Sequence, residues 1–300
     1  MRHFLLPIVL LILSACHTAA HKSLTQAPGH YFYDENNVRY TLVSTNGGKS
    51  INWLFIPGGP GFDSSSFNSL TDILKLQGNV WLIDFPGNGS HTLKKDGFDD
   101  WFKLVVPTVK RFQNPVIVGA SFGAMMPLLT PELENILSGF VILNSAPCIW
   151  FEEAGKRAKE LNLPSFEKEM TEFVNKPNQA TFNKALNACM PYYFAPHSLE
   201  QGRKLVGNVP FAIEPAMWWM KKVGEIAYNA TWVPESVSTL IVGAEFDAMT
   251  PLSCFQKDAR FKRKNIDIVF IKNAGHFPWI EQPKEVKRLF DKFEKRVVMK

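Results

Sequence analysis

Short apolar runs recur along this chain, and they constrain its fold more than any other feature of the sequence. Five of them lie at Val80–Ile83, Val116–Val118, Phe140–Leu143, Leu240–Val242 and Ile266–Ile271. Runs this short, rich in β-branched residues and without polar alternation, are typical of strands buried on both faces of a parallel sheet. Helical segments over Asp99–Phe112 and Pro283–Val297 supply crossovers. The pattern predicts an α/β fold with a mostly parallel central sheet flanked by helices.

The amino-terminal end of this region carries a different signal. Val38–Val43 and Ile51–Ile56 have the pattern of strands, and Asn46-Gly47-Gly48 between them is typical of a hairpin turn. We therefore expect these two strands to pair as an antiparallel opening to the sheet.

One long interval interrupts the alternation of strands and helices. Between Pro147 and Ser236 the pattern is helical and aromatic, with no strand-like run. We expect residues 148–236 to form a helical insertion over the sheet, and residues 31–147 and 237–300 to form the core.

Composition and charge exclude several classes of protein. Hydrophobic residues make up 46% of the chain and charged residues 20%, which excludes a disordered chain or a coiled coil. The net charge of +5 is scattered, so no nucleic-acid partner is expected. Four cysteines are too few for a disulfide scaffold. Beyond Cys16, a Cys148–Cys189 disulfide and buried free thiols are both open, and Cys254 leaves the number odd.

The first residues have the pattern of a secretory signal. Arg2 precedes an apolar run over Phe4–Leu13, which is too short to span a bilayer. Leu13-Ser14-Ala15-Cys16 resembles the bacterial lipobox, in which the cysteine becomes lipidated. A signal over residues 1–15, lipidation of Cys16 and a tether over residues 16–30 follow from this interpretation. The alternative is an ordinary secretory signal with a chance cysteine.

The resemblance to a lipobox implies a protein of the bacterial cell envelope, held at a membrane by its lipid. His17 after the cysteine indicates the outer membrane, facing the periplasm, if the source uses sorting of the Escherichia type. No later run is long and apolar enough to form a transmembrane helix.

A candidate nucleophile lies directly after one of the buried runs. Gly119-Ala120-Ser121-Phe122-Gly123 follows Val118 and precedes a helical pattern from Ala124 onward. A tight strand-to-helix turn needs small residues around the serine, and it presents the hydroxyl at the carboxyl edge of the sheet. Serine is a weak nucleophile and needs an adjacent base.

A base and an orienting carboxylate follow the last two strand-like runs. His276 follows Ile266–Ile271, and Asp247 follows Leu240–Val242, with Glu245 as its rival. The carboxyl ends of parallel strands share one edge of the sheet, where ligands bind in such folds. The chain order Ser121, Asp247, His276 therefore predicts a Ser-His-Asp triad for acyl transfer.

A glycine-rich loop over Pro57–Gly61 follows the strand Ile51–Ile56. Such a loop lets backbone N–H groups approach a substrate closely, and we expect Gly59 and Phe122 to donate to the oxyanion. No Gly-Lys-Ser/Thr follows, so a nucleotide site is not expected. The remaining histidines and cysteines have no metal-site spacing, and the sequence predicts neither metal nor cofactor.

Taken together, these motifs resemble the α/β-hydrolase superfamily, and within it the proline iminopeptidase-like group, over residues 31–297. The resemblance is carried by the loop Pro57–Gly61, the Gly-x-Ser-x-Gly elbow, the loop Asp84–Ser90, and Gly275–Trp279 with Glu281 and Pro283. It implies the α/β-hydrolase fold, a helical cap inserted after strand six, and serine hydrolase activity. Two departures stand out: Pro57 replaces the group's first histidine, and Phe85-Pro86 replaces a polar residue and an arginine.

Aromatic residues of the insertion are the candidates for substrate binding. Trp218, Trp219, Tyr192 and Tyr193 would line an apolar pocket, although packing of the cap onto the sheet is the alternative for each. The expected substrate is a carboxylic ester or related small acyl compound. An aminopeptidase acting on short peptides, and a non-catalytic surface binding protein on the same scaffold, are the alternatives. The oligomeric state is left open.

Overall fold

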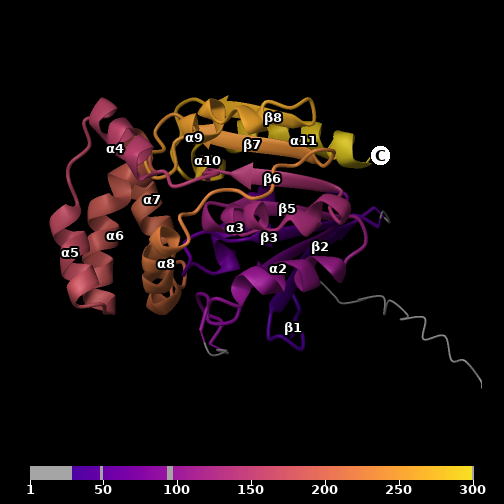
Figure 1. Cartoon of the computed structure of the whole chain (residues 1–300), viewed down its shortest axis with the longest axis horizontal. Helices are drawn as coiled ribbons and strands as arrows, with labels where there is room; N and C mark the ends of the chain where they lie inside the picture. The colour runs from indigo at the N-terminus through magenta and orange to yellow at the C-terminus, as the bar shows by residue number, and fades with distance from the viewer. Residues whose placement is uncertain (1–28, 48–49, 93–96, 299–300) are drawn as a thin grey trace, which may run out of the picture.

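The computed structural model describes residues 29–47, 50–92 and 97–298. The predicted signal, the candidate lipidation site Cys16 and nearly all of the tether lie outside the described residues. Eight strands form one sheet in the order β1-β2-β4-β3-β5-β6-β7-β8 (Figure 1). The strands are β1 (Tyr31–Tyr33), β2 (Arg39–Asn46), β3 (Asn52–Ile56), β4 (Gly78–Asp84), β5 (Pro115–Ala120), β6 (Gly139–Leu143), β7 (Ser238–Ala244) and β8 (Ile266–Ile271). Strands β3 to β8 are parallel, as the apolar runs predicted.

The expected hairpin between β2 and β3 is wrong. Strand β4 lies between them, and its Trp81 pairs with Leu42 of antiparallel β2 on one side and with Leu54 of parallel β3 on the other. A turn motif depends only on the local sequence, whereas the strands that pair with each other in a sheet depend on which residues must be buried. The central position places β3 between two parallel strands, and all five of its residues are buried. The antiparallel hairpin is instead formed by β1 and β2.

The described helices cover both faces of the sheet and one end of it. They are α1 (Asn68–Ile73), α2 (Trp101–Lys110), α3 (Phe122–Met125), α4 (Phe151–Glu160), α5 (Glu167–Asn175), α6 (Gln179–Tyr193), α7 (Leu199–Val206), α8 (Ile213–Glu225), α9 (Ser253–Lys257), α10 (Pro278–Glu281) and α11 (Pro283–Val298). Alternation along β3 sends Leu54 and Ile56 into a core shared with α2, α3 and α9. Trp53 and Phe55 enter the opposite core, shared with α1, α10 and α11.

Helices α4 to α8 lie between β6 and β7 in the chain, and we call them the cap (Figure 1). Helix α5 packs on α6 through a small cluster around Phe173 and Phe182. Helix α6 begins with a capping box, in which the Asn178 side chain accepts from the backbone of Thr181 and the Thr181 side chain from that of Asn178. The cap stands beside the sheet in Figure 1 rather than over either of its faces.

Two further findings concern the cysteines and the membrane. Cys148, Cys189 and Cys254 are all free thiols, so the Cys148–Cys189 disulfide is not formed. Within the described ranges, none of the helices has the length and apolar character needed to cross a bilayer.

Candidate active site

Ser121 occupies a sharp turn between β5 and α3. Its φ of 49° and ψ of −121° are unusual for a residue with a side chain, and such strain concentrates at functional positions. The flanking glycines have no room for a side chain. A Cβ on Gly123 would lie 2.1 Å from the Ile56 carbonyl oxygen, and one on Gly119 would lie 2.6 Å from that of Gly123. The Gly-x-Ser-x-Gly pattern is therefore a steric requirement of this turn.

His276 and Asp247 lie together at the carboxyl ends of β8 and β7. The Nδ1 atom of His276 is 3.0 Å from Oδ2 of Asp247, and both side chains are buried. The rival carboxylate, Glu245, accepts a hydrogen bond from the backbone of Asn273 instead. Asp247 lies in the loop between β7 and α9, which begins at Ser253.

Several donors surround the Asp247 carboxylate. Asn144 Nδ2 donates to Oδ2 at 2.9 Å, and the backbone N–H groups of Met249 and Thr250 donate to Oδ1 at 2.8 and 3.0 Å. Burial alone would raise the pKa of Asp247, but His276 and these donors hold that pKa below its usual value. The carboxylate is therefore ionised at neutral pH. Asn144 escaped the sequence analysis, although a polar residue directly after the buried run Phe140–Leu143 was the available signal.

One cavity brings the candidate residues together. Gly59, Ser121 and His276 line a cavity of about 250 Å³. The remaining lining is mostly apolar: Met125, Trp150, Phe151, Tyr193, Trp219, Met220, Val223, Met249 and Thr250. No carboxylate is among these lining residues.

The cap aromatics divide into two pairs. Tyr193 and Trp219 line the cavity. Trp218 and Tyr192 are not among the lining residues. The Trp218 ring packs against Trp101 and the Tyr192 hydroxyl donates to the Pro164 carbonyl. Adjacent residues on a helix point about 100° apart. Only one of Tyr192 and Tyr193, and only one of Trp218 and Trp219, therefore faces the cavity.

The glycine-rich loop passes close to Ser121. A Cβ on Gly58 would lie 3.0 Å from Cβ of Ser121, and Gly59 has a φ of 111°, which only glycine adopts readily. Asn88 fixes the loop from the side, because its Oδ1 accepts from Gly61 N at 2.8 Å and its Nδ2 donates to Phe62 O at 2.6 Å. Throughout the described part of the chain, no protein acceptor is found for the N–H groups of Gly59 and Phe122.

A buried ion pair supports this loop from below. Asp84, at the end of β4, accepts from Arg39 at 2.8 Å and from the backbone and hydroxyl of Ser64 at 2.7 and 2.6 Å. Burial raises the pKa of Asp84 above its usual value, although Arg39 and Ser64 oppose the shift. The pair connects β2 and β4 to the segment that follows the glycine-rich loop.

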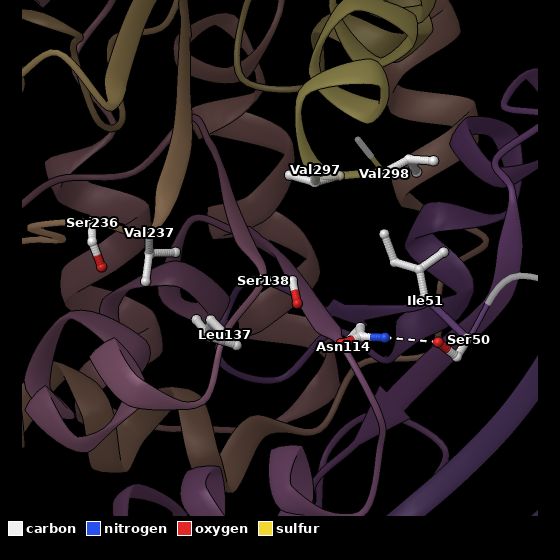
Figure 2. Close-up of a pocket in the computed structure, with 9 residues that line it drawn as sticks. All are labelled: Ser50, Ile51, Asn114, Leu137, Ser138, Ser236, Val237, Val297 and Val298. Carbon is white, nitrogen blue, oxygen red and sulfur yellow. Dashed lines mark hydrogen bonds between the residues drawn. The ribbon is translucent and has the colours of Figure 1, made fainter. Parts of the chain in front are cut away.

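A larger cavity, of about 510 Å³, lies at the opposite end of the strands (Figure 2). Ile51, Ser138 and Val237 precede β3, β6 and β7, and Asn114 donates to the Ser50 hydroxyl at 2.7 Å. Its lining contains no histidine, carboxylate or cysteine, so it lacks the groups for nucleophilic catalysis. A search of the described residues for groups of histidine, cysteine and carboxylate able to hold a metal ion found none.

Comparison with known proteins identifies the family and agrees with the fold. A sequence model of the alpha/beta hydrolase family matches residues 53–289. A proline iminopeptidase-related protein from Thermus thermophilus shares 17% identity and a TM-score of 0.67, over 90% of this chain and 98% of that one. An esterase from Exiguobacterium antarcticum shares 12% identity and a TM-score of 0.61, over 89% and 99%. These likenesses show the fold alone, and no curated protein matches the sequence.

Proposed function

Because the chain belongs to the alpha/beta hydrolase family, we propose that it hydrolyses a carboxylic ester or related acyl compound through Ser121, His276 and Asp247. The family makes the chain a hydrolase. The observation that carries the finer proposal is the cavity that Ser121 and His276 share, together with the bond from His276 to Asp247.

The proposed reaction passes through an acyl-enzyme. The Ser121 oxygen attacks the substrate carbonyl carbon while His276 takes the hydroxyl proton, and Asp247 stabilises the imidazolium. The N–H groups of Gly59 and Phe122 donate to the oxyanion, each being worth about 2.7 to 4 kcal/mol in the transition state. The alcohol leaves with the proton from His276. Water, deprotonated by the same histidine, then releases the acid and restores Ser121.

The lining of the cavity favours an ester over a peptide with a free amino terminus. Seven of its side chains are tryptophan, phenylalanine, methionine or valine, and none is a carboxylate that could hold an ammonium group. The second candidate is an aminopeptidase of the proline iminopeptidase type. Its support is the fold shared with the proline iminopeptidase of Mycobacterium smegmatis, at 15% identity.

Turnover measurements separate these candidates. We expect kcat/KM of the purified protein to be higher for nitrophenyl esters, with an optimum at short chain length, than for prolyl and alanyl anilides. Ser121→Ala is the blank and should lose turnover. Anilide preference would favour the aminopeptidase. If a fluorophosphonate fails to label Ser121, the chain is a binding protein on a hydrolase scaffold.

For location, we propose a lipid anchor at Cys16 that holds the enzyme in the bacterial cell envelope, facing the periplasm from the outer membrane. The support is the sequence Leu13-Ser14-Ala15-Cys16 and His17 after it. Cys16→Ala should move the protein from the membrane fraction to the soluble fraction, and mass spectrometry of the wild type should find acyl chains on Cys16.

A further inference from the structure

The carboxyl end of cap helix α6 contacts both loops that carry the proposed acid–base pair. The Tyr193 carbonyl accepts from the backbone N–H of His276 at 2.6 Å. The neighbouring carbonyl of Tyr192 accepts from Ala248, next to Asp247, at 3.0 Å. These are the last carbonyls of a helix, which have no partner within the helix itself. The loops of His276 and Asp247 therefore supply hydrogen-bond donors to the last carbonyls of α6.

The approach of the two segments is too close for any residue but glycine before the histidine. A Cβ on Gly275 would lie 2.2 Å from the Tyr193 carbonyl oxygen. The ring of Tyr193 meets that of His276 edge-on, with centroids 5.2 Å apart. Tyr193 also lines the cavity, so one residue contacts the cavity, the His276 backbone and the His276 ring.

Glu281 also links the His276 loop to the segment that follows α6. Its Oε2 accepts from Gly275 N at 2.5 Å, on the His276 loop. Its Oε1 accepts from Ala195 N at 2.9 Å and from the Ser198 hydroxyl, both just after α6. One carboxylate at the end of α10 thus joins the cap to the loop of His276, and the mechanism above does not use it.

We propose that Glu281 is a positioning residue, which together with the end of α6 holds His276 at the angle that proton transfer from Ser121 requires. The inference rests on the proposed function. It assigns the cap a role in catalysis besides covering the cavity. A carboxylate is suited to this task, because its two oxygens accept from two segments at once and charge-assisted hydrogen bonds are the stronger ones.

Two substitutions of Glu281 remove different numbers of its three hydrogen bonds. Glu281→Gln keeps the shape, but its amide NH₂ group faces an N–H donor in either orientation, so at least one of the three bonds is lost. Glu281→Ala loses all three. We expect kcat to fall about 10- to 100-fold in the alanine variant and less in the glutamine variant, with KM within about twofold of wild type. Titration with a fluorophosphonate gives the concentration of functional active sites, so kcat is expressed per active site and corrected for any loss of folded protein.

Glu285→Gln is the matched control, because Glu285 lies on the neighbouring helix α11 and its carboxylate accepts from Arg288. Its kcat should equal that of wild type. A normal kcat per active site in both Glu281 variants would overturn the positioning role. A uniform fall that includes Glu285→Gln would overturn it as well.

A second measurement does not depend on turnover. The His276 Nδ1 proton, shared with Asp247, should give a downfield proton resonance in the wild type and lose it to solvent exchange in Glu281→Ala. If the wild type hydrolyses no ester or anilide, the proposed function fails while this resonance still tests the positioning. If turnover is present and the resonance persists unchanged in Glu281→Ala, the positioning fails alone.

Discussion

Replacing Gly123 with alanine tests whether the elbow is a steric requirement. The new Cβ would lie 2.1 Å from the Ile56 carbonyl oxygen and 2.5 Å from that of Pro57. A carbon–oxygen contact normally needs about 3.3 Å, so the two segments must separate by about 1 Å. Both oxygens belong to backbone, which has no rotamer to change. We expect a loss at the upper end of the range for overpacking, about 3 kcal/mol in the free energy of unfolding.

The loss has two readouts. For a chain of this length the melting temperature should fall by about 6 °C or more, and urea denaturation should give the free energy directly. Displacement of Pro57 also moves Gly59, so we expect kcat/KM to fall by about 100-fold or more through loss of an oxyanion donor.

Gly155→Ala is the control for the elbow variant. Gly155 lies in α4 with nothing within 4 Å of the added Cβ, so alanine there should stabilise the protein by about 0.5 to 1 kcal/mol. A Gly123→Ala variant within about 0.5 kcal/mol of wild-type stability would refute the steric account, since surface substitutions alone change stability by that much.

Three further outcomes concern carboxylates and the groups that donate to them. Asp247→Asn should lower kcat by about 10⁴-fold, because an amide cannot stabilise the imidazolium of His276; near-normal ester turnover would contradict its role. Arg39→Met should reduce the free energy of unfolding in urea by about 3 to 5 kcal/mol, because it leaves the carboxylate of Asp84 buried and unpaired. Glu134 accepts four hydrogen bonds from Trp232, Glu235 and Ser236. Burial raises the pKa of Glu134, but these donors outweigh it and lower that pKa to about 2. The stability that ionised Glu134 gives is complete above its ordinary pKa of about 4.5 and is lost as pH falls toward 2. The difference in the free energy of unfolding between wild type and Glu134→Gln should therefore shrink between about pH 4.5 and about pH 2. A constant difference over this window would exclude the linkage.

The local sequence was sufficient to predict the parallel strands and the elbow. A buried strand needs a continuous apolar run, and a serine at a tight turn needs glycine on both sides, so each pattern is set by nearby residues. The chain order of Ser121, Asp247 and His276 then located the candidate site, because parallel strands end at one edge. The selection of Asp247 over Glu245 as the partner of His276 agrees with the observed bond.

What the sequence alone determined is therefore the set of elements and the residues at their ends. Tertiary structure decided which elements are neighbours: β4 lies between β2 and β3 despite a strong turn signal, because burial of β3 outweighs a local hairpin. It also decided that Trp219 and Tyr193 face the cavity while Trp218 and Tyr192 do not. Asn144 and Glu281 contact the loops of Asp247 and His276 across gaps of 103 and 6 residues. The contacts of Asn144 with Asp247 and of Glu281 with Ala195 join segments far apart in the chain, so they depend on how those segments pack.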